Sequence, residues 1–188
     1  MSTFVKIIIA AACICLPLRA AAVDRELVYT YIGPVMSGGF NNIEYRDWFD
    51  FYTGTKKISG YFLGGGASIW VMSKWLIGDF SIQCQYNQNE RTLHHLYYTV
   101  SGRVGIQMGT VAIFAPGIGL YFETPPSNRK YNGGAGIRAP LAVLFNTTFD
   151  TKLFLEGSVM YGWYGIGEKS TKLFYGINAG FVFKVGRI

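Results

Sequence analysis

Side chains alternate between two faces along an extended segment. By this alternation, five ionisable residues fall on the polar face of their segments. They are Asp79, Arg103, Arg138, Glu156 and Lys184. Ions of opposite sign at similar depth pair with each other, because buried ions persist only when they are paired and hydrogen-bonded. Distance from the segment ends predicts similar depth for four of these residues, with Arg138 nearer the middle. Such a cluster serves either as a plug of paired side chains or as a gate for ions and small solutes.

Two adjacent histidines, His94 and His95, are the other candidates for chemistry. Neighbouring residues of a strand point to opposite faces, so this pair cannot hold one metal ion together, and the chain has only these 2 histidines. His95 with Ser101 or Ser81 has the residue types of a base and a nucleophile, but no motif holds them within hydrogen-bond reach. We therefore expect polar lining, with no catalysis, no metal and no cofactor.

The elements that would position these residues are strands, and the last dozen residues show this most clearly. The odd-numbered positions are almost all apolar: Tyr175, Ile177, Ala179, Phe181, Phe183 and Val185. The even-numbered positions are mostly small or polar: Gly176, Asn178, Gly180, Lys184 and Gly186. Side chains of a strand alternate between two faces, so one face is apolar and the other polar. A soluble sandwich has the same alternation, and the rest of the chain must decide which face is inside.

The alternation recurs in eight segments: 26–36, 58–71, 75–86, 93–107, 110–122, 134–146, 151–165 and 171–187. Most are longer than a typical soluble strand and match the length of tilted strands that cross a bilayer. Short and long connections alternate, as in outer-membrane barrels. Charges avoid the apolar face, and the polar face carries mainly Gly, Ser, Thr and Gln, which suits a narrow enclosed lumen. The sequence thus predicts an all-β, eight-stranded antiparallel up-and-down transmembrane β-barrel.

Some side chains do not follow this division of the two faces. Phe62, Trp70 and Ile113 fall on the nominal interior. Six rings lie near predicted strand ends, where amphipathic aromatic side chains settle at the level of the lipid headgroups. They are Trp70, Trp75, Tyr86, Tyr161, Trp163 and Tyr175. Trp70 therefore has two competing interpretations.

The N-terminus has the pattern of a secretory signal. Lys6 precedes an apolar run that is followed by three alanines, so residues 1–22 are expected to be removed and 23–188 to form the barrel domain. Lipoprotein processing at Cys13 is the weaker alternative. Cleavage would leave Cys84 as the only cysteine, so no internal disulfide is expected. It would also leave 15 of the 17 basic residues against 11 acidic ones, a mild excess that does not indicate nucleic-acid binding.

The first long connection, expected over 38–57, contains many aromatic residues. They are Tyr45, Trp48, Phe49, Phe51 and Tyr52. Exposed rings of this kind need a partner, so the loop is interpreted as a lid over the barrel mouth, as a contact for a host or partner molecule, or as a continuation of the strands. Glu123, with Arg129 and Lys130 in the second long connection, 123–133, is expected in the solvated rim or in contact with lipid headgroups.

Two short motifs resemble those of the small eight-stranded outer-membrane barrels, the group that contains OmpX, the OmpA membrane domain and OmpW. The C-terminal residues Asn178, Gly180, Phe183 and Val185 resemble the signal read by the barrel assembly machinery, and 115–121 is similar to a mid-barrel stretch of OmpW-like proteins. The resemblance implies a monomer in the bacterial outer membrane, with lipid as its surroundings. It also implies passive transport of small hydrophobic molecules without a chemical step. The alternative is a structural or adhesive surface barrel with a closed lumen, whose loops bind a partner.

Overall fold

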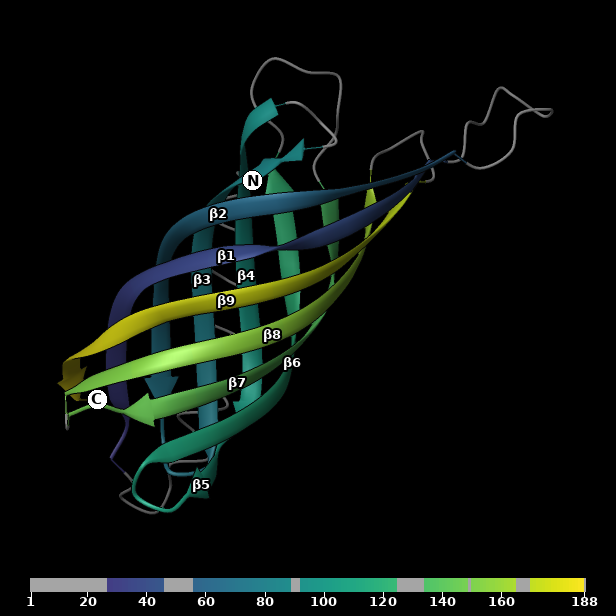
Figure 1. The fold of residues 1–188 in the computed structure, drawn as a ribbon. Coiled ribbons are helices and arrows are strands. Elements are labelled where there is room, and N and C mark those ends of the chain that lie inside the picture. The colour runs from purple at the N-terminus through teal and green to yellow at the C-terminus, as the bar shows by residue number, and fades with distance from the viewer. Residues whose placement is uncertain are drawn as a thin grey trace, which may run out of the picture.

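The computed structural model describes residues 27–45, 56–88, 92–124, 134–148, 150–164 and 170–187. Within these ranges the chain forms nine strands of a single sheet (Figure 1). They are β1 (Tyr29–Tyr45), β2 (Lys56–Met72), β3 (Leu76–Asn87), β4 (Thr92–Val104), β5 (Ile106–Met108), β6 (Ala112–Thr124), β7 (Gly134–Asn146), β8 (Thr151–Tyr164) and β9 (Ser170–Arg187). No helix in the described ranges is long and apolar enough to cross a membrane.

The sheet closes on itself. Each strand is antiparallel to the strands with which it pairs, and β1 pairs with β9 over most of their length, from Tyr29 opposite Arg187 to Glu44 opposite Thr171. On the other side, β4 pairs with β6. Among the described strands, closure leaves no unpaired edge, which is the general way in which all-β proteins avoid edge-to-edge association.

Two of the nine strands are parts of one crossing. Arg103 lies opposite Gly117 and Ile106 lies opposite Phe114, so β4 and β5 hold the same register on β6 across the break at Gly105. The unpaired positions Val104 and Gly105 lie across from Pro116 and Ala115, and Pro116 has no N–H for a ladder hydrogen bond. With β4 and β5 taken as one segment, the described chain crosses the barrel eight times, and the predicted eight-stranded antiparallel up-and-down topology is confirmed.

The strand bounds differ from the sequence prediction mainly at the first connection. Residues 134–146 form β7 as expected, but β1 continues to Tyr45, well beyond the predicted end at 36. Gly39 was interpreted as part of a loop, yet it lies within the strand, where a Cβ atom would be only 2.0 Å from the Tyr175 carbonyl oxygen. A glycine at this position permits close strand contact and does not mark a turn.

The two rims of the barrel differ in their connections. One rim, called the turn rim below, carries the short links 73–75, 109–111 and 147–150 together with the paired ends Tyr29 and Arg187. Gly109 has a positive φ of 64°, which a tight turn requires and glycine adopts without strain. The opposite ends of the strands form the other rim, which is called the loop rim below.

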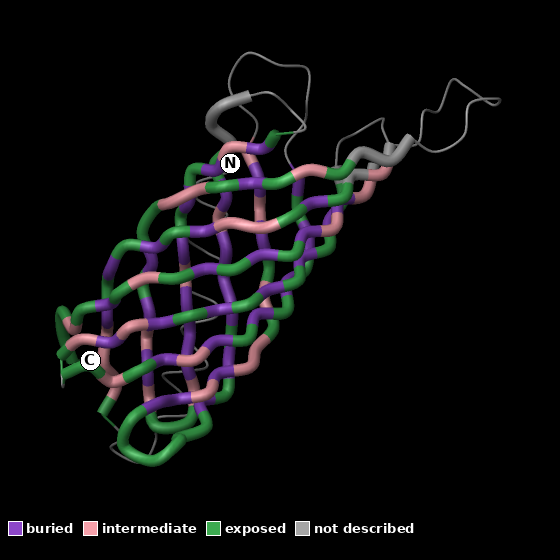
Figure 2. The backbone as a smooth tube through the Cα atoms, in the orientation of Figure 1, coloured by how far each residue is buried: buried purple, intermediate pink, exposed green. Residues whose placement is uncertain are grey.

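Burial alternates residue by residue along the strands, as Figure 2 shows. The outward side chains are largely apolar and exposed; Met36 is 74% and Ile177 62% exposed. The inward side chains are buried and include both polar and large apolar residues. Trp70 is 2% exposed and lies inside, so its expected place in an aromatic girdle was wrong, whereas Trp75 and Trp163 are exposed near the ends of strands.

Candidate functional site

Four buried ions from four strands meet inside the barrel. Arg103 of β4 donates to Asp79 of β3 with an Nε–Oδ2 distance of 2.6 Å, and its Nη2 group donates to Glu156 of β8. Arg138 of β7 donates from Nη2 to Glu156 and lies 3.5 Å from Asp79 through Nη1. These four residues are called the central ion cluster. Because Arg103 reaches from β4 to β8, the cluster spans the lumen between strands that are not neighbours.

The central ion cluster is neutral and embedded in further hydrogen bonds. Asn178 Nδ2 donates to Glu156 at 2.5 Å, and Arg138 Nη1 donates to Thr99 at 2.7 Å. The Arg103 guanidinium lies 4.7 Å from the centre of the Trp70 ring. Buried ion pairs offset their desolvation cost only when geometry and extra hydrogen bonds are good, and this arrangement supplies both.

Lys184, the fifth expected member, lies apart from the other four. Its ammonium group is 3.7 Å from Asp150 at the turn rim and 4.1 Å from the Tyr29 ring centre. The position on β9 that pairs with Glu156 is Asn178, and Lys184 is six residues, roughly 20 Å, nearer the turn rim. Strands of a barrel are tilted and staggered, so equal distance from a turn does not mean equal height.

Below the central ion cluster, toward the turn rim, the lumen is filled by an apolar layer. This turn-side layer consists of Tyr31, Val35, Trp70, Met72, Ile77, Ile113, Ala115, Ala142, Leu144, Phe154 and Val182. The Trp70 and Phe154 rings pack with centroids 5.1 Å apart, and the Trp70 indole N–H donates to Ser68 at 3.2 Å. The sequence placed Trp70 and Ile113 on the inward face, but it did not show that the apolar residues of different strands form one layer.

Above the central ion cluster, toward the loop rim, a second layer of rings closes the lumen. This loop-side layer consists of Phe62, Tyr97, Tyr121, Met160 and Phe174. The Phe174 ring contacts Phe62, Tyr97 and Tyr121 edge to face, with centroid distances of 5.6, 5.7 and 5.8 Å. Edge-to-face packing places the positive ring edge against a negative ring face.

A polar network that sequence reasoning missed lies beside the loop-side layer. Lys172 is 0% exposed; it donates to the Tyr97 hydroxyl at 3.1 Å and to Glu123 at 3.5 Å. Asn87 also donates to Tyr97 at 3.1 Å, and Asn41 donates to Asn87 at 2.9 Å. Glu123 is buried, so the expectation of a solvated rim charge was wrong for this residue. Lys172 has the same parity on β9 as Asn178, and that signal was available in the sequence.

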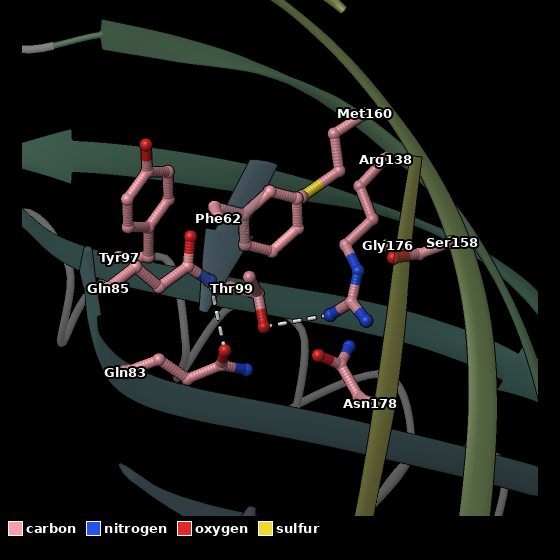
Figure 3. A pocket seen from close by; sticks show the side chains of 10 residues that line it. All are labelled: Phe62, Gln83, Gln85, Tyr97, Thr99, Arg138, Ser158, Met160, Gly176 and Asn178. Carbon is pink, nitrogen blue, oxygen red and sulfur yellow. Dashed lines mark hydrogen bonds between the residues drawn. The ribbon is translucent and has the colours of Figure 1, made fainter. Parts of the chain in front are cut away.

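A small cavity lies between the central ion cluster and the loop-side layer (Figure 3). Its volume is about 10 Å³, and its walls include Phe62, Gln85, Thr99, Arg138 and Met160. A volume of this size holds about one water molecule. The rings of the loop-side layer lie on one side of the cavity and the central ion cluster on the other, so three successive groups of buried side chains fill the described part of the lumen.

The other predicted site residues fall in three places. Of the assembly signal, Asn178 and Gly180 point inward, and Phe183 and Val185 are exposed outward. Tyr45 is the last residue of β1, while Trp48, Phe49, Phe51 and Tyr52 lie outside the described residues, as do the signal segment 1–22 and Cys13. The two serines considered as nucleophiles lie in the polar lining, where Ser81 shares a 2.7 Å hydrogen bond with Thr99 and Ser101 accepts from Arg138 at 3.3 Å.

The outward face defines the class of protein. Exposed apolar side chains lie on all sides of the closed sheet. Other side chains of the described residues already fill the interior, so these apolar side chains have no protein core to pack into. Hydrocarbon satisfies such a surface, and a closed barrel satisfies every backbone group within it. The chain is a transmembrane, eight-stranded antiparallel up-and-down β-barrel.

The chain is similar to several solved structures. No protein-family model matches the chain, and no curated protein sequence matches it. Neisserial surface protein A (NspA) is similar over 81% of this chain and 97% of its own, with 12% identity and a TM-score of 0.47. The attachment invasion locus protein Ail of Yersinia pestis has 13% identity over 80% and 98% of the two chains and a TM-score of 0.34. The outer membrane protein OprG of Pseudomonas aeruginosa has 13% identity over 84% and 97% and a TM-score of 0.41. The class assignment rests on the strand pairing and the two faces described above.

Proposed function

We propose that this protein is a bacterial outer-membrane barrel whose lumen stays closed and whose role is to hold its loop rim at the cell surface for contact with a partner. No chemical step is part of this role. An even number of antiparallel crossings, short links on one rim and longer ones on the other are typical of bacterial outer-membrane barrels. The single observation that carries the closed-lumen role is the stack of turn-side layer, central ion cluster and loop-side layer.

The cost of opening this stack supports a static role. A path for an ion or a polar solute would have to separate the Arg103 and Arg138 contacts to Glu156 and also part the Trp70–Phe154 ring pair. Breaking a buried ion pair, so that one charge is left without its partner, costs about 3–5 kcal/mol. An eight-stranded barrel also has an interior only wide enough for its own side chains.

Passive transport of small hydrophobic molecules is the second candidate. The resemblance of 115–121 to OmpW-like proteins suggested it, and the turn-side layer is the feature that favours it. An apolar solute would contact Trp70, Leu144 and Phe154 more favourably than an ion would. This candidate requires the rings of both layers to move apart during passage.

Uptake into sealed lipid vesicles containing the purified protein separates the two candidates. The closed-barrel proposal predicts that vesicles with the wild-type protein take up small ions, sugars and a small apolar dye no faster than protein-free vesicles. A triple variant, Trp70→Ala with Glu156→Ala and Phe174→Ala, removes one large or charged side chain from each of the three levels and is expected to raise ion leakage. Trp75→Ala, an exposed ring at the turn rim, is the matched control and is expected to change nothing. Faster uptake of the dye by the wild type would overturn the closed-barrel proposal in favour of transport.

A further inference from the structure

A chain of hydrogen bonds connects Arg138 with Gln85, two residues that line the small cavity. Arg138 Nη1 donates to Thr99, whose hydroxyl shares a 2.7 Å hydrogen bond with Ser81. Gln83 Nε2 donates to Ser81 at 3.2 Å, and Gln85 Nε2 donates to Gln83 Oε1 at 3.0 Å. Figure 3 shows the two end members of this chain, Gln85 and Arg138, among the side chains that line the cavity.

The two ends of the chain are polar atoms without a protein hydrogen-bond partner within the described residues. They are Gln85 Oε1, an acceptor, and Arg138 Nε, a donor. Both side chains are 3% exposed. A buried polar atom without a partner is unfavourable, so two such atoms on residues that line one cavity indicate a bound molecule that satisfies them.

We propose that the cavity holds one internal water molecule that donates to Gln85 Oε1 and accepts from Arg138 Nε, closing the chain into a ring. The cavity volume of about 10 Å³ suits one water and nothing larger. A cation is repelled by the Arg138 guanidinium, and an anion is repelled by the Gln85 carbonyl oxygen. Water both donates and accepts, and it fits either orientation of the Gln85 amide.

This water site is independent of whether the barrel transports a solute. Its neighbours on the loop side are Phe62, Met160 and the buried ring of Tyr97. The water is therefore held between the central ion cluster and the loop-side layer, away from bulk solvent. We expect it to exchange with bulk solvent slowly compared with surface water.

The test is detection of the water in the folded protein by high-resolution crystallography, together with water–amide magnetisation transfer by NMR in detergent micelles. The wild type is expected to show one ordered water within hydrogen-bond distance of both Gln85 and Arg138. Gln85→Leu removes the acceptor at nearly constant volume and is expected to lose the water. Gln107→Leu makes the same change at an exposed position and is expected to keep it.

Two results would overturn the site. One is a wild-type cavity that contains no ordered water and shows no magnetisation transfer, with Gln85 Oε1 bonded to a protein group instead. The other is an unchanged water in a folded Gln85→Leu variant. The wild-type measurement decides the matter even if the variant does not fold.

Discussion

At the scale of single residues, Glu156 accepts hydrogen bonds from more strands than Asp79, the other carboxylate of the central ion cluster. It accepts from Arg103, Arg138 and Asn178, which belong to three different strands. Asp79 has one short contact, to Arg103, and a longer one to Arg138. The loss of charge at Glu156 would leave two guanidinium groups with one carboxylate in a closed space.

Glu156→Gln should therefore destabilise the barrel strongly. The variant keeps the size of the side chain but removes its charge, and breaking a buried pair in this way costs about 3–5 kcal/mol. Urea unfolding of the protein folded in lipid vesicles measures the change. A loss below about 1 kcal/mol would contradict the assigned role of the central ion cluster.

Asp150→Asn is the matched control for this change. Asp150 is the partner of Lys184 at the turn rim, and its side chain is 70% exposed. Exposed ion pairs contribute no more than about 1 kcal/mol, so the same assay should detect little or no change.

The sequence predicted the members of the central ion cluster better than it predicted their heights. Period-two alternation is a local property, and it correctly turned Asp79, Arg103, Arg138 and Glu156 inward. Height within the barrel depends on the register of distant strands. That register places Asn178, and not Lys184, beside Glu156.

At the scale of elements, β6, β7 and β8 are joined by a tyrosine that packs over glycines. A Cβ atom on Gly162 of β8 would lie 1.7 Å from the Tyr121 hydroxyl, and one on Gly136 of β7 would lie 2.6 Å from the same ring. Tyr121 is fully buried in the loop-side layer. The absence of side chains at these two positions leaves room for the ring.

Gly162→Ala should strain this contact. The added methyl group overlaps the Tyr121 ring, which is fully buried in the loop-side layer, and overpacking of this kind costs about 1–3 kcal/mol. Urea unfolding in vesicles is the measurement. Gly157→Ala is the control on the same strand, because nothing lies within 4 Å of its added Cβ; equal losses for both variants would contradict the explanation.

The cause of the strain can be tested with a second substitution. Tyr121→Leu removes the ring that the Gly162→Ala methyl group would overlap. The double variant should then lose less stability relative to Tyr121→Leu than Gly162→Ala loses relative to the wild type. Additive losses would show that the ring is not responsible.

Strand bounds were the least predictable part of these elements. In the sequence, Gly38 and Gly39 look like the start of a loop, because glycine is common in turns. In the barrel, Gly39 allows β1 to approach β9 at the Tyr175 carbonyl oxygen. Only the three-dimensional arrangement distinguishes the two uses of glycine.

At the scale of the whole molecule, the outward face must match a bilayer in depth as well as in polarity. Ile177 lies near the middle of β9, opposite Gly38 and Gly157, whereas Val185 lies close to the turn rim. Both side chains are exposed. A charge placed at these two depths should therefore have different effects.

Ile177→Lys should cost roughly 2–4 kcal/mol in vesicles, and Val185→Lys only about 0–1 kcal/mol. A lysine at the middle of the hydrocarbon layer cannot reach water, while one at the rim can extend to the headgroups. The comparison is made by urea unfolding in the same lipid. Equal costs at the two positions would contradict the placement of the membrane.

The general architecture could be predicted because one rule, alternation with period two, fixes both faces of every strand. The packing of side chains inside the lumen could not be predicted in this way. Phe62, Trp70 and Ile113 were recognised as inward residues, but alternation cannot show that rings from distant strands pack together as Phe174 does with Tyr121. That packing depends on barrel closure and register.

Contacts between lipid acyl chains and side-chain methyl groups test the account most directly. Nuclear Overhauser effects are measured on the wild-type protein in lipid, with outward Val159 and Ile177 compared with inward Leu144 and Val182. The account predicts strong acyl-chain signals at Val159 and Ile177 and none at Leu144 and Val182. Acyl-chain signals at the inward pair, or their absence at the outward pair, would contradict it.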